Sequence, residues 1–188
     1  MNLEIINLQK FCPVDESKIK KVIKTVLRDE KKDAELCVTL MDNKGIKKVN
    51  KNFLKHNYAT DVLSFAYHEA SRKNKVAQQS QHKICRSVPL QKEVEKPGKT
   101  CFRSHDDEKK FLQEKTITGE IVISAEMAAE VAQENGYPVE GEIVLYVIHG
   151  LLHLLGYDDK KKSAAKKMHL KEKELLERFG YHNIPVPD

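Results

Sequence analysis

The sequence predicts a single α+β domain. Its 188 residues, 40% of them hydrophobic, suffice for one hydrophobic core and are too few for two full-sized domains. Short segments in which apolar residues alternate, as in strands, are mixed with longer segments in which apolar residues recur at helical spacing. A polar stretch, residues 69–116, separates two of the predicted strands. We therefore expect one domain over residues 1–188 that carries 69–116 as an exposed basic insertion.

Before the insertion, predicted strands and helices alternate along the chain. Residues 3–8 alternate roughly, and the acidic pair Asp15 and Glu16 marks a helix start. Apolar residues recur every three or four positions over 17–28, which predicts an amphipathic helix. The elements that follow are a strand over 34–41, a helix around 46–53 and a strand over 61–67.

After the insertion, the pattern is one strand followed by three helices. The strand covers 117–124, and the first helix covers 125–135 and stops at Gly136. A nearly apolar helix follows over 140–155, and a third covers 163–179. The apolar run 143–155 is shorter than the 20 or so residues that a membrane span needs, so we expect a buried helix and no membrane partner.

The positive charge of the chain is regional. The net charge is +5, and residues 69–116 alone contain 12 Lys/Arg against 7 Asp/Glu, whereas the other 140 residues carry 21 of each sign. Only 12 of these 48 residues are apolar, so the segment is not expected to form core. Three roles stay open for it: a basic tether for RNA, a lid over a cleft, or a neutral surface elaboration.

Cysteine usage and the N-terminus indicate the compartment. Cys12, Cys37, Cys85 and Cys101 show no paired C-x-x-C spacing, which argues against a cysteine-based zinc site and against a dense disulfide framework. No basic segment followed by an apolar stretch of signal-peptide length opens the chain. We expect a cytoplasmic protein.

The segment HGLLHLLGYDD, residues 149–159, carries the strongest chemical signal. His149 and His153 are four residues apart, so both imidazoles project from one helical face and can reach a single ion. Gly156 lets the chain leave the helix, and the turn can bring Asp158 or Asp159 back as a third ligand. Three protein ligands and one open position are typical of a catalytic zinc site, so we predict one Zn²⁺ ion.

This helix also allows two other interpretations. A buried histidine is often only a hydrogen-bonded core residue, but burying two imidazoles among Ile, Val and Leu costs desolvation unless something binds them. The peptidase motif H-E-x-x-H needs glutamate after the first histidine, and that residue is Gly150 here. A peptidase is therefore disfavoured.

Three motifs in this order resemble the bacterial YbeY family of metal-dependent endoribonucleases: TDVLSF at 60–65, GEIVIS at 119–124 and HGLLHLLGYD at 149–158. The resemblance covers residues 1–179 apart from the insertion. It implies a mixed sheet of about four strands packed with helices, and a zinc ion at a zincin-like metal helix. It also implies single-stranded RNA as substrate, maturation of the 3′ end of small-subunit ribosomal RNA, a role in ribosome quality control, and the ribosome or ribosomal proteins as partners.

The sequence departs from the family pattern at two positions. The family motif His-x3-His-x5-His places Asp159 where a third histidine is usual, and aspartate is a competent zinc ligand. Members usually carry an arginine six residues before the threonine of TDVLSF, and that position is Leu54. The adjacent Lys55 and His56 could substitute for the arginine, although a lysine offers a point charge and not a bidentate fork.

The strand motif and the lysine runs each have two interpretations. Asp61 and Ser64 either orient a ligand histidine or touch the RNA, or Asp61 merely begins the strand. The lysine runs 160–162 and 166–167 form either a solvated helix face or contacts to phosphates.

The leading hypothesis is a zinc-dependent, single-strand-specific endoribonuclease whose ion is held by His149, His153 and Asp159. The competing hypothesis is a catalytically weak ribosome- or RNA-binding protein with a structural metal, in which Leu54 marks lost catalysis.

Overall fold

The fold is α+β with a mixed four-stranded sheet, as predicted. The computed structural model describes residues 1–67 and 115–186. Their elements are β1 (Asn2–Asn7), α1 (Glu16–Asp29), β2 (Asp33–Met41), α2 (Asn43–Leu54), β3 (Val62–Ala66), β4 (Thr116–Ser124), α5 (Ala125–Asn135), α6 (Val139–Leu154) and α7 (Lys162–Arg178). Each predicted strand and helix is present within a few residues of its expected bounds.

The strand order in the sheet is β1-β2-β4-β3. β1 pairs parallel with β2 and β2 with β4, whereas β3 runs antiparallel to β4. The register places Val38 opposite Ile121 and Leu63 opposite Val122. The predicted insertion connects β3 to β4 and, apart from residues 115 and 116, lies outside the described residues, so its exposure stays a prediction.

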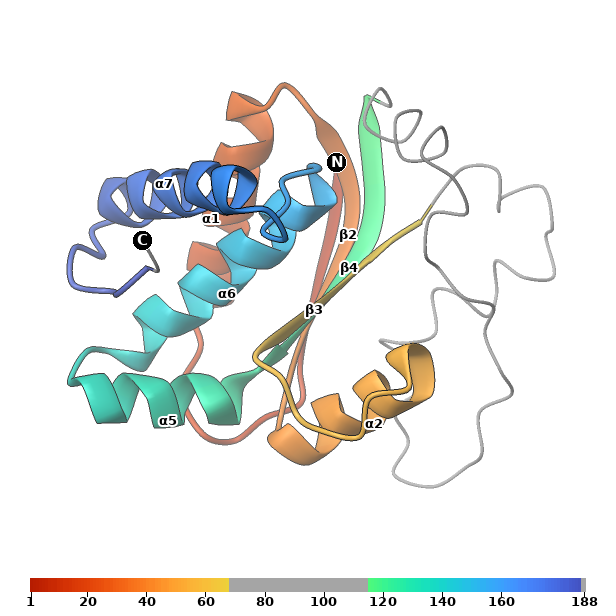
Figure 1. Cartoon of the computed structure of the whole chain (residues 1–188), viewed down its shortest axis with the longest axis vertical. Helices are drawn as coiled ribbons and strands as arrows, with labels where there is room; N and C mark the ends of the chain where they lie inside the picture. Colours follow the sequence, from red (N-terminus) through yellow and green to blue (C-terminus); the bar gives the residue numbers. More distant parts are fainter. Residues whose placement is uncertain (68–114, 187–188) are drawn as a thin grey trace, which may run out of the picture.

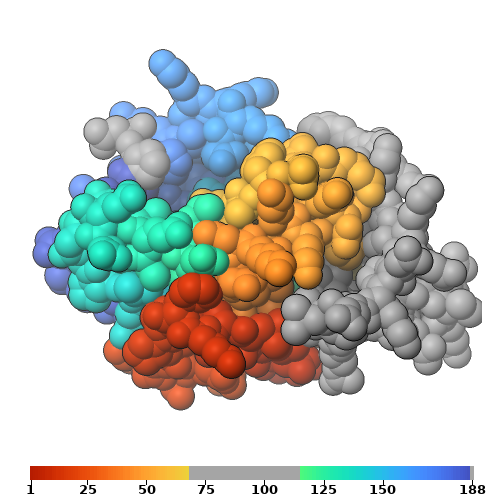
Figure 2. Space-filling model, turned by 90° about the horizontal axis from the view of Figure 1, so that it is seen from below, coloured from red at the N-terminus to blue at the C-terminus, as the bar shows by residue number. Residues whose placement is uncertain are grey.

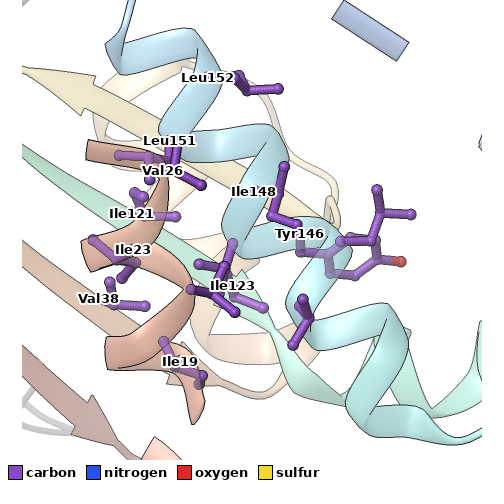
Figure 3. Close-up of a cluster of buried hydrophobic side chains, with 14 of the residues drawn as sticks. Ile19, Ile23, Val26, Val38, Ile121, Ile123, Tyr146, Ile148, Leu151 and Leu152 are labelled. Carbon is purple, nitrogen blue, oxygen red and sulfur yellow. The ribbon is translucent and has the colours of Figure 1, made fainter. Parts of the chain in front are cut away.

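One face of the sheet packs against α1 and α6 to form the main core (Figure 3). The apolar stripe predicted for α1 is buried, with Asp15 capping the first turn by accepting hydrogen bonds from the backbone N–H groups of Ser17 and Lys18. β2 and β4 bury side chains on both faces of the sheet, so their sequences are nearly continuous hydrophobic runs. The core side chains labelled in Figure 3 are Ile19, Ile23, Val26, Val38, Ile121, Ile123, Tyr146, Ile148, Leu151 and Leu152.

The opposite face of the sheet packs against α2. Ile46 and Val49 of this helix bury against Phe65 of β3 and Val122 of β4. Seen from below, α2 and the residues after it lie next to α5 on the molecular surface (Figure 2). The two faces of the sheet thus carry separate hydrophobic clusters.

α6 lies at the centre of the helices that cover the face of the sheet opposite α2. It crosses β3 and β4 on one side and contacts α1, α5 and α7 on the others (Figure 1). At Gly150 the helix approaches the sheet closely, and Ser64 Oγ donates a hydrogen bond to the Gly150 carbonyl at 3.1 Å. Within residues 1–67 and 115–186, none of the helices has the length and apolar character to cross a membrane.

Candidate metal centre

The two histidines of α6 point their Nε2 atoms at each other. These atoms lie 3.0 Å apart, and the rings of His149 and His153 are nearly perpendicular, at 82°. Two nitrogens bound tetrahedrally to one zinc ion at Zn–N distances of about 2.0 to 2.1 Å lie roughly 3.3 Å apart. The observed separation is close to that value, so both imidazoles can bind the same ion through Nε2.

The other nitrogen of each ring is held by the protein. His149 Nδ1 lies 2.8 Å from Glu172 Oε1, and His153 Nδ1 lies 3.1 Å from the backbone carbonyl oxygen of Tyr157. Both partners are acceptors, which favours the proton on Nδ1 of each ring. Metal-binding histidines commonly show this arrangement, because it fixes the ring and leaves Nε2 free for the ion.

Asp159 completes a group of three. One ligand atom from each of His149, His153 and Asp159 lies within 4.8 Å of the others, and Asp159 Oδ2 is 3.8 Å from His153 Nε2. Gly156, with φ of +92°, lets the chain reverse direction after the helix. Asp158 Oδ1 instead accepts a hydrogen bond from the backbone N–H of Lys160, two residues on, at 3.4 Å.

Electrostatics at the group favour a cation. Burial lowers the pKa of His149, but the hydrogen bond and charge of Glu172, together with the charges of Asp61 and Asp159, outweigh burial and raise the pKa above its ordinary value. Burial lowers the pKa of His153, and neighbouring His149 lowers it further. Three carboxylates, Glu172, Asp61 and Asp159, therefore favour positive charge at His149.

Asp61 and Ser64 lie at the edge of this group. Asp61 Oδ1 accepts from the hydroxyl of Thr60 and from the backbone N–H of Val62, both at 2.8 Å, so it fixes the start of β3. Its charge also acts on His149. The hydroxyl of Ser64 donates a hydrogen bond to the backbone of α6 and thus ties this helix to the sheet.

Lys55 lies at the C-terminal end of α2. Its backbone is left-handed, with φ of +67°, and its Nζ donates to the carbonyl oxygen of Asn52 at 2.8 Å. Leu54 precedes it and is exposed. The hydrogen bond described for Lys55 is thus local to its own helix.

Gly150 occupies a position where a side chain does not fit. A Cβ atom there would lie 2.8 Å from Ile121 Cγ2, 3.0 Å from Ser64 Oγ and 3.2 Å from Val62 Cγ2. The glutamate of an H-E-x-x-H peptidase therefore has no space in this packing. The close packing of α6 on the sheet thus excludes a glutamate general base at position 150.

Sequence reasoning missed Glu172. Its side chain lies on the buried face of α7, in the same stripe as Met168, Leu175 and Leu176. A carboxylate in an apolar helical stripe is a usable signal, because a buried charge needs a partner. That partner is His149.

Residues 4–180 match a protein-family model described as Endoribonuclease YbeY. The chain belongs to the YbeY family. The relative named Endoribonuclease YbeY in Bacillus licheniformis is 33% identical over 147 residues, which cover 78% of this chain and 73% of the relative. The relative of the same name in Clostridium botulinum strain Loch Maree is 32% identical over 183 residues, covering 95% and 98%. The resemblance in the three motifs is thus confirmed at the level of the family.

A solved structure supports the fold of this YbeY family member. The solution structure of TM1509 from Thermotoga maritima matches with a TM-score of 0.54 and 22% identity, covering 94% of this chain and 88% of that one. At this identity the match shows the fold alone.

Proposed function

We propose that this YbeY family protein is a zinc-dependent endoribonuclease that cleaves single-stranded RNA. The observation that carries the proposal is the pair of Nε2 atoms 3.0 Å apart, each in a ring whose Nδ1 faces a protein acceptor. With both Nδ1 atoms directed at protein acceptors, the two Nε2 atoms can present their lone pairs to one ion. Membership of a family whose matched relatives are named endoribonucleases supports RNA as the substrate.

The donor set fits zinc. Two imidazole nitrogens and one carboxylate oxygen are ligands that zinc accepts, and a four-coordinate ion keeps one position open beyond the three protein ligands. When bound, the ion supplies Lewis acidity toward a phosphodiester and activates water near neutral pH. Substitution of histidine by Asp159 makes the donor set harder than three imidazoles would be, which widens its tolerance for other divalent ions.

The protein's own groups prepare the site. Glu172 and the Tyr157 carbonyl hold protons at Nδ1 and fix both rings, which limits the reorganisation that ion binding requires. The site is at the surface: the side chains of His149 and His153 are 25% and 29% exposed, and that of Asp159 is 43% exposed. An RNA strand can therefore reach the site while the protein scaffold stays in place.

The biological role is proposed from the family resemblance. Maturation of the 3′ end of small-subunit ribosomal RNA and ribosome quality control require contact with the ribosome or ribosomal proteins, and they place the protein in the cytoplasm. The proposed substrate within that process is single-stranded ribosomal RNA.

Cleavage of end-labelled RNA tests the activity. The zinc-loaded protein is expected to cut a single-stranded RNA, to leave the same sequence intact in a duplex, and to lose cleavage on addition of a chelator. Asp159→Ala is expected to lower cleavage strongly, whereas Asp158→Ala, its matched neighbour, is expected to retain it. Chelator-resistant cleavage, or equal loss in both variants, would contradict the site.

One observation supports the alternative of an RNA-binding protein with a structural metal, and the cleavage assay also tests that alternative. The exposed position 54 carries leucine, so no guanidinium is available there to grip a phosphate. RNA binding with no chelator-sensitive cleavage would favour the alternative of a ribosome- or RNA-binding protein with a structural metal.

A further inference from the structure

A groove beside α7 is separate from the three metal ligands. After α7 the chain turns at Gly180 and runs back toward the connection between α5 and α6 (Figure 1). This return leaves a groove of about 650 Å³ between α7, the C-terminal segment and that connection. Its polar lining includes Tyr137, Lys166, His169, Lys173, His182 and Asn183.

The groove carries positive charge that none of the described residues neutralises. Lys166 and Lys173 are exposed, and neither has an ion-pair partner within the described part of the chain. By contrast, Lys18 pairs with Glu140 at 2.7 Å. None of the described residues that line the groove is acidic. Two unpaired ammonium groups facing one concave surface favour an anionic ligand.

The remaining polar groups suit a phosphate. Among the described residues, the buried His169 Nδ1 has no hydrogen-bond partner, and the imidazole of His169 lines the groove. The amide of Asn183 and the ring of His182 add further hydrogen-bonding groups. Ammonium, imidazole and amide groups together form a donor-rich surface of the kind that binds phosphate oxygens.

The groove adjoins the metal centre through α7. His169 is one helical turn before Glu172, and side chains three residues apart on a helix are neighbours. Glu172 in turn contacts His149 at 2.8 Å. One stretch of α7 therefore borders both the groove and the candidate metal centre.

We propose that this groove binds the phosphate backbone of the RNA substrate beside the cleavage site. The proposal rests on the proposed function and adds a substrate-binding surface to it. Lys166 and Lys173 act as phosphate contacts, and the groove holds the strand while the neighbouring segment lies at the metal centre. An RNA phosphate is favoured over an acidic protein partner because the groove borders the proposed site of RNA cleavage.

Binding of an RNA analogue that cannot be cleaved provides the test. The probe is a fluorescent single-stranded 2′-O-methyl oligonucleotide of mixed sequence, titrated with the zinc-loaded full chain at several salt concentrations. Lys166→Gln/Lys173→Gln is compared with Lys20→Gln/Lys24→Gln, which removes two lysines from the surface groove on α1. Both variants carry the same net charge, so they separate local contact from overall charge.

The groove variant is expected to bind on the order of tenfold more weakly, with a salt slope lower by about 1.4, since each single-strand phosphate contact adds about 0.7. The α1 variant is expected to stay close to wild type. Equal affinity of wild type and the groove variant, or equal loss in both variants, would overturn the proposal. Selective loss of binding in the groove variant supports RNA binding by the groove. If the wild type also fails to cleave RNA, that failure counts only against the proposed function. A wild type that binds no RNA overturns both.

Discussion

Glu172 Oε1 lies 2.8 Å from Nδ1 of His149, and this contact joins α7 to α6, the helix of the candidate metal centre. The Glu172 side chain is buried, with the residue 1% exposed, so its charge is not solvated by water. A buried carboxylate is costly without a partner, and the imidazole supplies one. The packing of α7 and the orientation of His149, a candidate metal ligand, thus depend on the same residue.

Replacement of Glu172 by Gln is expected to weaken zinc binding about 10- to 100-fold, the usual effect of losing a partner that orients a metal-binding histidine. Gln has similar size but lacks the charge that holds the proton on Nδ1. Competition with a chromogenic chelator measures the zinc affinity. Glu177→Gln, at an exposed position on the same helix, is the control. Equal zinc affinity in all three proteins would show that Glu172 has no role at the metal.

Replacement of Gly150 by Ala is expected to lower the free energy of unfolding by about 1 to 2 kcal/mol. The new methyl group would press on Ile121, Ser64 and Val62. The free-energy cost of this overpacking exceeds the gain in helix propensity from Gly to Ala. Urea denaturation measures the change. Gln133→Ala, at an exposed position of α5, is expected to leave stability nearly unchanged. A Gly150→Ala protein as stable as wild type would mean that α6 does not approach the sheet this closely.

Glu120 is a buried carboxyl on the other face of the sheet. Within the described part of the chain, neither of its oxygens makes a hydrogen bond of good geometry, although the nearby Tyr67 hydroxyl acts to lower its pKa. Burial is the main cause that raises the pKa of Glu120 from 4.5 to about 7. The folded protein therefore keeps this proton over a pH range in which the unfolded chain has released it.

This difference predicts that the free energy of unfolding falls as pH rises from about 4.5 to about 7. The folded state binds more protons in this window, so each rise in pH favours unfolding, by roughly 3 kcal/mol in total. Glu120→Gln stays neutral and is expected to remove this slope. Urea denaturation of both proteins from pH 4 to 8 checks it. Parallel stability profiles for the two proteins would contradict the raised pKa.

Replacement of Leu54 by Arg is expected to raise RNA cleavage on the order of tenfold, the value of one charge-assisted contact to a phosphate. The position is exposed at the C-terminal end of α2, where a positive charge is compatible with the helix dipole. Initial cleavage rates are compared with those of Leu54→Lys, which adds charge without the bidentate fork and is expected to gain less. If neither variant differs from wild type, position 54 does not face the substrate.

Local patterns predicted the elements of this fold well. The stripe from Ile19 to Leu27 is buried as its spacing indicated, and Gly136 ends α5 in a left-handed conformation. The order of the strands in the sheet could not be predicted from local patterns. β4 inserts between β2 and β3, and no local pattern encodes such a pairing. The family resemblance implied a mixed sheet of about four strands and did not specify their order.

The candidate site likewise combines residues whose positions local spacing predicted with residues placed by the packing of distant segments. The spacing of His149 and His153 on one helix predicted that they converge, because helical periodicity is local. The choice between Asp158 and Asp159 depended on a turn whose geometry the sequence leaves open. Glu172 comes from another helix, and its place at the site depends on how α7 packs on α6.

Titration of zinc into the metal-free protein, with the rate of single-stranded RNA cleavage recorded at each step, tests the central claim most directly. The His149, His153 and Asp159 group predicts that the rate rises from near zero and reaches a plateau at one zinc ion per chain. A His149→Ala/His153→Ala protein is expected to stay inactive throughout. Full cleavage before zinc is added, or the same titration curve for the double variant, would contradict a zinc-dependent endoribonuclease centred on these histidines.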